Sequence, residues 1–181
     1  IPYSSEAYFP HGNDFNGDDS LDFITIGADP VVLMSSENGI RDTSQNFKSM
    51  LIDQRIGGNT ESVGNIWTHT TAVGDLDNNG TLDMYIPSHI LDRYESCGGH
   101  PAGCQNFTLL NDGDGNFVAG SADFPFTGNV WGSAIADFDN DGYGDILISL
   151  DDIQENHIFY NHKHWSTSSG MIMFGNSEGN Y

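Results

Sequence analysis

Short apolar segments rich in β-branched and aromatic residues alternate with polar, glycine-containing turns along this chain. Runs of roughly four to eight such residues are typical of β-strands. The clearest runs each leave an acidic turn, at residues 21–27, 82–88 and 145–150. A further apolar run follows each of them, at residues 30–34, 106–110 and 171–174. Long segments with helical periodicity are missing, although residues 44–56 could form a short helix or an outer strand.

The acidic turns share one pattern, D-x-[DN]-x-[DN]-[GD]-x-x-D. Its three copies start 61 and 62 residues apart, at Asp14–Asp22, Asp75–Asp83 and Asp137–Asp145. A fixed period of this size is typical of stacked or ringed supersecondary units. With incoming strands at 70–74 and 132–136, and an outer strand from Phe117 or Tyr181, each unit has room for four strands. The pattern therefore predicts an all-β fold of three propeller-like blades of four antiparallel strands, each about 60 residues long.

We divide this one repeat domain into approximate units 1–62, 63–124 and 125–181. A closed propeller has about four to eight blades, and three would not close one. If another copy followed Tyr181, 58 residues would separate Asp137 from the next Asp14, which continues the rhythm. The chain also begins with Ile1 rather than Met. We therefore expect a processed chain, or part of a longer product, whose units continue in a larger assembly.

Oxygen atoms at positions 1, 3, 5 and 9 of each turn, with the carbonyl of position 7, are placed to converge on one metal ion. The candidate ligands are Asp14, Asn16, Asp18, Ser20 and Asp22; Asp75, Asp77, Asn79, Thr81 and Asp83; and Asp137, Asp139, Asp141, Tyr143 and Asp145. Hard oxygen donors favour Ca²⁺ over zinc or copper. The alternative is three ordinary polar turns, but the same offsets in three copies make coincidence a poor explanation. We predict three calcium sites, with the third the tightest because it has four Asp side chains.

An EF-hand would need Glu at position 12 between two helices, and this chain has Thr25, Ile86 and Ile148 there, within strand-like flanks. The turns joining two strands resemble the FG-GAP or VCBS repeat family, the calcium-loop blades of integrin α-chain propellers. The resemblance implies a β-propeller-like fold in which calcium is mostly structural. The first copy has Asp19 where Gly is usual, which puts the geometry of that turn in question.

Composition narrows the classes of partner. The net charge is −21, with five Lys and Arg, so the surface repels nucleic acid and anionic membranes. An aromatic content of 12% and the regular apolar runs argue against intrinsic disorder. No transmembrane run is visible, so we expect no membrane insertion.

Cys97 and Cys104 close a Gly- and Pro-rich loop, which favours a disulfide between them. Two free thiols, or half of a zinc site with His100, remain alternatives. Asn106 begins an N-glycosylation sequon that ends at Thr108, and a sugar there would lie on the outside. Calcium, disulfide and sequon together predict a secreted or cell-surface location.

Other polar and aromatic groups give weaker indications. Asp112 and Asp114 favour a hairpin turn over a further metal site, because no carboxylate follows at the required offset. Four aromatic residues could stack on sugars but are more often core residues: Tyr94, Trp131, Tyr160 and Trp165. A polar cluster that we interpret as a solvated loop contains Asp151, Asp152, Glu155, His157, His162 and His164. It lacks a catalytic motif, and His69 is interpreted as a packed strand residue.

Three functional hypotheses follow. The first is a calcium-stabilised extracellular structural or adhesion module, either the repeating subunit of a filament or a piece of a larger propeller. The alternative is a carbohydrate-binding, lectin-like propeller, and the third hypothesis is an accessory domain of a secreted enzyme. We expect the chain itself not to be an enzyme. The expected partners are copies of itself, joined end to end or completing a ring, with glycans or a cell-surface protein as further candidates.

Overall fold

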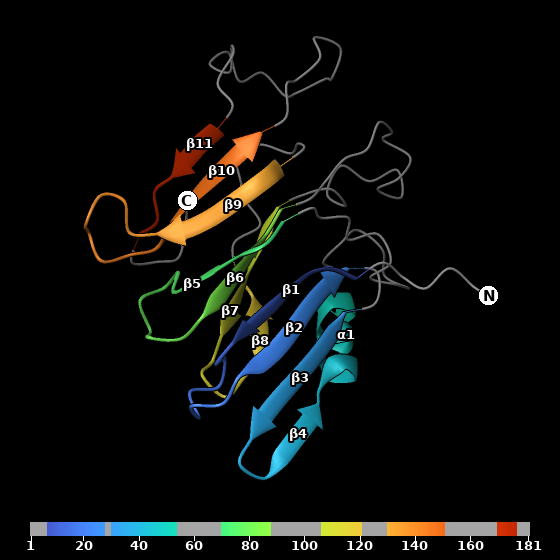
Figure 1. Cartoon of the computed structure of the whole chain (residues 1–181). Coiled ribbons are helices and arrows are strands. Elements are labelled where there is room, and N and C mark those ends of the chain that lie inside the picture. Colours follow the sequence, from blue (N-terminus) through green and yellow to red (C-terminus); the bar gives the residue numbers. More distant parts are fainter. Residues whose placement is uncertain are drawn as a thin grey trace, which may run out of the picture.

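Three antiparallel β-sheets follow one another along the chain and stack face to face (Figure 1). The computed structural model describes residues 7–27, 30–53, 70–87, 106–120, 130–150 and 170–176. Within them the architecture is all-β apart from one helix, and the sheets do not close into a barrel. Each sheet falls within one of the three expected units.

Sheet 1 has the strand order β1-β2-β3-β4. Its strands are β1 (Ala7–Asn13), β2 (Asp22–Gly27), β3 (Val31–Ser36) and β4 (Gly39–Asp42). The register of β1 shifts between Tyr8 and Pro10, and Pro10 fits there because β1 is an edge strand. The sequence left residues 44–56 open between helix and strand, and the structure has α1 (Ser44–Asp53). This helix lies beside β3 and β8.

Sheets 2 and 3 repeat the meander of sheet 1. Sheet 2 has the order β5-β6-β7-β8, with β5 (Ala72–Gly74), β6 (Asp83–Ile86), β7 (Phe107–Asn111) and β8 (Phe117–Ala119). Sheet 3 has the order β11-β10-β9, with β9 (Val130–Ala136), β10 (Asp145–Leu150) and β11 (Gly170–Met173). The strands predicted around the acidic turns are confirmed, with ends shifted by at most two residues. A fourth strand of sheet 3, expected from Tyr181, lies outside the described residues.

Two hydrophobic cores separate the three sheets. The core between sheets 1 and 2 contains Phe15, Ile24, Ile26, Val32, Met34, Phe47, Met84, Ile86, Phe107, Leu109 and Phe117. The core between sheets 2 and 3 contains Ala72, Leu76, Tyr85, Val130, Ile146, Ile148 and Met173. Sheet 2 is therefore covered on both faces.

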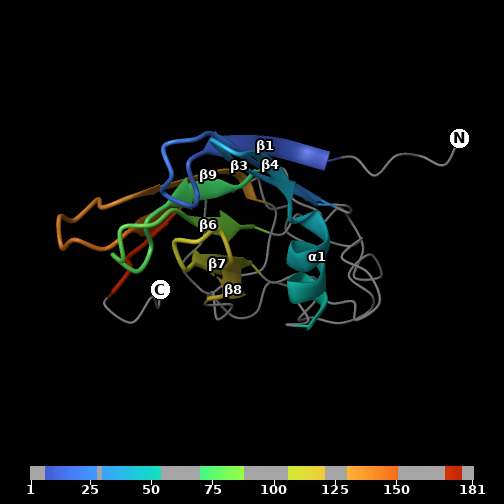
Figure 2. The ribbon, with the colours of Figure 1, turned by 90° about the horizontal axis from the view of Figure 1, so that it is seen from below.

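The burial patterns of β6 and β10, the second strands of sheets 2 and 3, differ because these sheets are covered on different numbers of faces. Every residue of β6 is buried, as expected for a strand between two cores. In β10, buried Ile146 and Ile148 alternate with exposed Leu147 and Ser149, because only one face is covered. The acidic turns lie at one end of the stacked sheets, and α1 lies toward the other (Figures 1 and 2).

Candidate metal centres

Each acidic turn joins the first two strands of its sheet. We name them loop 1 (Asp14–Asp22), loop 2 (Asp75–Asp83) and loop 3 (Asp137–Asp145), and number their positions 1 to 9. The last ladder pair before each loop joins its position 9 to the residue preceding position 1: Asn13 with Asp22, Gly74 with Asp83 and Ala136 with Asp145. The strand ends therefore close each loop at its base.

The same hydrogen bonds fold all three loops. The position 1 carboxylate accepts from the backbone amides of positions 5 and 6, at 3.1 and 2.9 Å for Asp14. Asp75 and Asp137 accept from the corresponding amides. The position 5 side chain accepts from the amide of position 7, at 2.8 to 2.9 Å in the three loops. Side-chain oxygens thus fix each turn with its polar groups gathered inside.

The backbone also takes the same course in each loop, with left-handed residues at positions 4 and 6. Loop 1 has Gly17 at φ 70° and Asp19 at φ 63°. In the other loops the order of residue types is reversed: Asn78 at 59° and Gly80 at 86°, then Asn140 at 63° and Gly142 at 95°. Asp tolerates this region better than most residues. The Asp19 departure, which put loop 1 in question, therefore leaves the turn intact.

Position 9 ties each loop to the third strand of its sheet. Asp22, Asp83 and Asp145 are buried. One oxygen of each accepts from the amide of position 2, at 2.7 to 2.8 Å. The other oxygen accepts from a backbone amide at 2.7 to 2.9 Å. For Asp22 and Asp83 this amide belongs to Ser35 and Asn111, within the third strands β3 and β7, and for Asp145 it belongs to Gly175, just beyond β11. These carboxylates therefore hold loop and sheet together.

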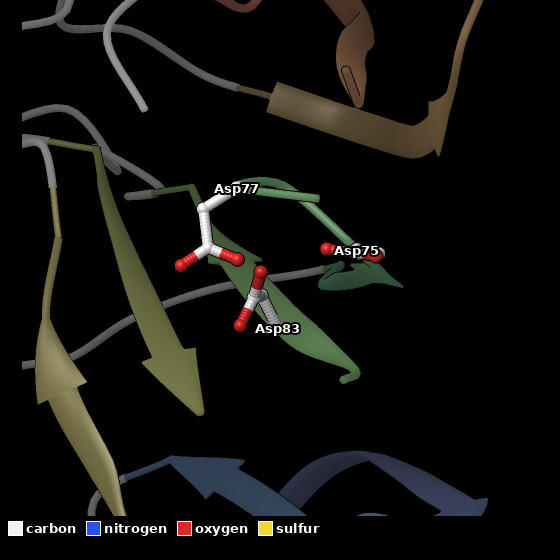
Figure 3. Close-up of side chains that lie close together, drawn as sticks. All are labelled: Asp75, Asp77 and Asp83. Atoms are coloured by element: carbon white, nitrogen blue, oxygen red, sulfur yellow. The ribbon is translucent and has the colours of Figure 1, made fainter. Parts of the chain in front are cut away.

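Three carboxylates converge in loop 2. One oxygen from each of Asp75, Asp77 and Asp83 lies within 4.8 Å of the others, and the side chains lie close together in Figure 3. The pKa of Asp83 is raised to about 6, mainly by burial and also by the negative charges of Asp77 and Asp75, against the effect of its two backbone hydrogen bonds. Converging like charges in a partly desolvated site favour a bound cation.

Loop 3 has the same arrangement in Asp137, Asp139 and Asp145. The pKa of Asp139 is raised by desolvation first and then by its acidic neighbours. In loop 1, position 3 is Asn16, so no triad of carboxylates forms there. The all-oxygen donor sets of loops 2 and 3 fit a divalent cation. The position 5 residues Asp18, Asn79 and Asp141, and the carbonyls of Ser20, Thr81 and Tyr143, lie in the loops but not in these triads, and as ligands they stay predictions.

The loops also contact one another, through groups that the sequence did not single out. The Asn111 side chain donates from Nδ2 to the carbonyls of Phe15 in loop 1, at 2.6 Å, and Leu82 in loop 2, at 3.2 Å. The backbone carbonyl of Asn111 accepts hydrogen bonds from the side chains of Asn79 and Thr81. Between loops 2 and 3, a Cβ on Gly144 would lie 2.4 Å from the Asp75 carbonyl, so Gly permits this approach. The sequence gives no sign of this role of Asn111, because the equivalent residue that bonds the position 9 carboxylate is Ser35 in sheet 1 and Gly175 in sheet 3.

Residues 102–148 match the family model of the FG-GAP-like repeat. This segment is similar to an FG-GAP-like repeat. The matched segment begins before β7, ends within β10 and includes loop 3. The resemblance inferred from the acidic turns is therefore confirmed for this part of the chain. A comparison with curated proteins found no match.

Several other predicted groups lie outside the described residues of this chain. They are the Cys97–Cys104 pair, His100, His69, the cluster Asp151–His164, Tyr94, Tyr160 and Trp165. Trp131 lies in β9, but its side chain is likewise outside the described part. The expected hairpin turn is confirmed between β7 and β8, where the Asp112 carboxylate accepts from the amides of Asp114 and Asn116.

The sequon at Asn106 lies at a buried position. Asn106 is fully buried and Thr108 is buried within β7, whereas an N-linked sugar needs an amide that reaches solvent. Glycosylation of Asn106 stays a prediction, and this burial does not favour it. The described helix is also not long and apolar enough to cross a membrane.

Proposed function

We propose that this chain is a calcium-stabilised extracellular structural or adhesion module built of propeller-like blades. The supporting observation is the position 9 carboxylate, which is buried, bonds its own loop and holds the third strand of its sheet. An ion bound at this carboxylate would join loop and sheet at one point. Metal binding would therefore add directly to the stability of the fold.

Calcium is the ion that the donor set favours. All candidate ligands are oxygen atoms, and Ca²⁺ accepts six to eight of them in flexible geometry, whereas Mg²⁺ demands near-ideal octahedral sites. The FG-GAP resemblance implies the same ion. Calcium is abundant outside cells, which agrees with the extracellular location that we propose.

The arrangement of sheets supports the propeller-like part of the proposal. Meanders of four, four and three described strands stack through apolar faces, and their loops gather on one side (Figure 2). The converging carboxylates of loops 2 and 3 are placed to hold a metal ion, and the bonds of the position 9 carboxylate to its loop and sheet favour a structural role for that ion.

Thermal unfolding in calcium and in chelator tests the function. Binding to the folded state alone stabilises by roughly 2.7 kcal/mol per site at a hundredfold excess of ion over its Kd. We expect chelator to lower the Tm by many degrees and added Ca²⁺, more than Mg²⁺, to restore it. Asp112→Asn is the matched control, because it removes an acidic residue outside the three loops. An unchanged melting curve in chelator would refute the proposal.

A further inference from the structure

Position 3 of loop 1 is Asn16, and Gly17 follows it, a sequence that favours a reaction between side chain and backbone. Glycine has no Cβ to hinder its amide nitrogen, so the preceding Asn side chain can close a ring on it. The chain contains two further Asn-Gly pairs, one in the turn between β3 and β4 (residues 38–39) and one in loop 2 (residues 79–80). The three pairs share this local chemistry, but the fold places them in different surroundings.

In loop 1 both reacting groups are accessible. Gly17 is exposed and Asn16 is half-buried. Among the described residues, no hydrogen bond engages the Gly17 amide, and a Cβ on Gly17 would meet no heavy atom beyond its chain neighbours within 4 Å. The Asn16 side chain makes two long bonds to Asp18: Oδ1 accepts from its amide and Nδ2 donates to its carboxylate, each at 3.3 Å. Little therefore holds this side chain away from the Gly17 nitrogen.

In loop 2 the same pair of residue types is held on both sides. The Gly80 amide donates to Asp75 Oδ2 at 2.9 Å. Asn79 Oδ1 accepts from the backbone amide and the hydroxyl of Thr81, at 2.8 and 2.6 Å, and Asn79 Nδ2 donates to the Asn111 carbonyl at 3.2 Å. Closing a ring on the Gly80 nitrogen would break these bonds. The fold therefore protects the pair in loop 2 and leaves the pair in loop 1 open.

We propose that Asn16 is a site of spontaneous deamidation and that calcium bound in loop 1 slows the reaction. The Gly17 backbone nitrogen loses its proton and attacks Asn16 Cγ. The new N–Cγ bond forms, the Cγ–Nδ2 bond breaks and Nδ2 leaves as ammonia, so a succinimide ring joins the two residues. Water then opens the ring: cleavage of the new N–Cγ bond gives aspartate, and cleavage of the original peptide bond gives isoaspartate. Overall one water is consumed and one ammonia released, with no oxidation or reduction.

The aspartyl product gives loop 1 the ligand set of loop 3. Asn16 Oδ1 accepts from the amide of position 5, as Asp77 Oδ1 and Asp139 Oδ1 do in their loops, at 3.1 to 3.3 Å. A carboxylate at residue 16 would therefore lie where the position 3 carboxylates of the two triads lie. Isoaspartate instead adds a methylene group to the backbone between positions 3 and 4 and shortens the side chain, which moves this oxygen out of place.

The slowing by calcium depends on the same side-chain oxygen. An ion in loop 1 would hold Asn16 Oδ1 inside the turn, whereas ring closure requires the side chain to rotate back onto the Gly17 nitrogen. The reaction itself needs no metal and goes beyond the proposed function. The slowing rests on the proposed function, because it requires an ion in loop 1.

Peptide mass spectrometry of the full chain, over a time course of incubation in chelator and in saturating Ca²⁺, tests the proposal. The temperature stays below the Tm in chelator, and aspartate and isoaspartate are separated by retention and fragmentation. In chelator we expect Asn16 to convert about as fast as Asn38, which is exposed in its turn, and several-fold faster than Asn79. Calcium should slow Asn16 several-fold and leave Asn38 unchanged. In denaturant the three rates should become similar, because only the fold distinguishes the pairs.

Gly17→Asn is the matched variant. Position 4 is Asn78 in loop 2 and Asn140 in loop 3, at φ 59° and 63°, close to the 70° of Gly17, so the substitution keeps the course of the backbone. The added side chain hinders attack by the nitrogen of residue 17. We expect conversion of Asn16 to fall several-fold in this variant, while Asn38 keeps its wild-type rate.

Each part of the proposal has an outcome that overturns it. Asn16 that stays intact in chelator would remove the modification site, and equal rates at Asn16 and Asn79 in the folded chain would remove its structural basis. An Asn16 rate that calcium leaves unchanged would overturn the slowing. Melting curves separate these failures from failure of the proposed function. Calcium-dependent melting with an inert Asn16 would overturn the deamidation alone, whereas calcium-independent melting with a converting Asn16 would refute the structural calcium sites alone.

Discussion

At the scale of single residues, the three loops repeat a backbone path more strictly than they repeat residue types. Left-handed residues occupy positions 4 and 6 in every loop, yet the Gly moves from position 4 in loop 1 to position 6 in loops 2 and 3. Gly, Asn and Asp all tolerate that region, so one Gly is enough and its place can change. A sequence pattern that requires Gly at position 6 would therefore reject loop 1, although Asp19 adopts the left-handed conformation needed there.

This conformation predicts the effect of replacing Asp19. Asp19→Gly and Asp19→Ala both remove one charge, but only Gly takes φ 63° without steric cost. We expect Asp19→Gly to be more stable than Asp19→Ala by about 1 kcal/mol, the order of the left-handed penalty. Urea denaturation in calcium measures both free energies of unfolding, with wild type as reference. Equal stabilities would show that the backbone at Asp19 is not strained.

The charge of the ligands predicts the ranking of the sites. Loop 3 has four Asp side chains where loops 1 and 2 have three Asp and one Asn, and ligand charge is one determinant of calcium affinity. We expect loop 3 to bind most tightly, Asp139→Asn to weaken it, and the reciprocal Asn16→Asp to strengthen loop 1. Calorimetric titration resolves these changes, with Asp112→Asn as control. If Asp139→Asn leaves every affinity unchanged, charge does not control the ranking.

At the scale of elements, the sequence indicated the strands and the loops but not the ties between them. Strand runs and acidic turns are local, so composition and spacing were enough to place them. The role of Asn111 depends on the Phe15 carbonyl, 96 positions away, which no local pattern contains. Asn106 shows the same limit, because its sequon is local whereas its burial results from the packing around β7.

Asn111 predicts a coupling between two loops. Asn111→Ala keeps the backbone amide that bonds Asp83 but removes the side-chain bonds to the Phe15 and Leu82 carbonyls. An unsatisfied buried polar group costs about 1–3 kcal/mol, so we expect weaker calcium binding in loops 1 and 2 and little change in loop 3. Titrations of the variant measure all three. Asn116→Ala, which loses only a bond to Asp112 in the same hairpin, is the control, and equal effects of both would contradict the coupling.

At the scale of the whole molecule, the period of the loops predicted the number of sheets but not which faces each sheet covers. Position 2 is apolar in all three loops, and the sequence treats Phe15, Leu76 and Phe138 alike. Their exposures differ because, within the described residues, another sheet packs over the first two but not over Phe138. Burial therefore depends on order in the stack, and that order exists only once the sheets pack face to face.

The net charge gives the last prediction. The chain has a formal charge of −21 and gathers acidic groups at one end of the stacked sheets, where each calcium ion would add two positive charges. Without calcium, repulsion among these groups opposes folding, and salt weakens it because the Debye length falls to about 3 Å at 1 M. We expect NaCl to raise the Tm steeply in chelator and much less in saturating calcium, where the bound ions already relieve the repulsion. Melting curves over the same NaCl series measure both slopes, and KCl in place of NaCl controls for specific binding of the cation. Equal slopes in the two conditions would mean that the acidic loops do not control the electrostatic stability of the fold.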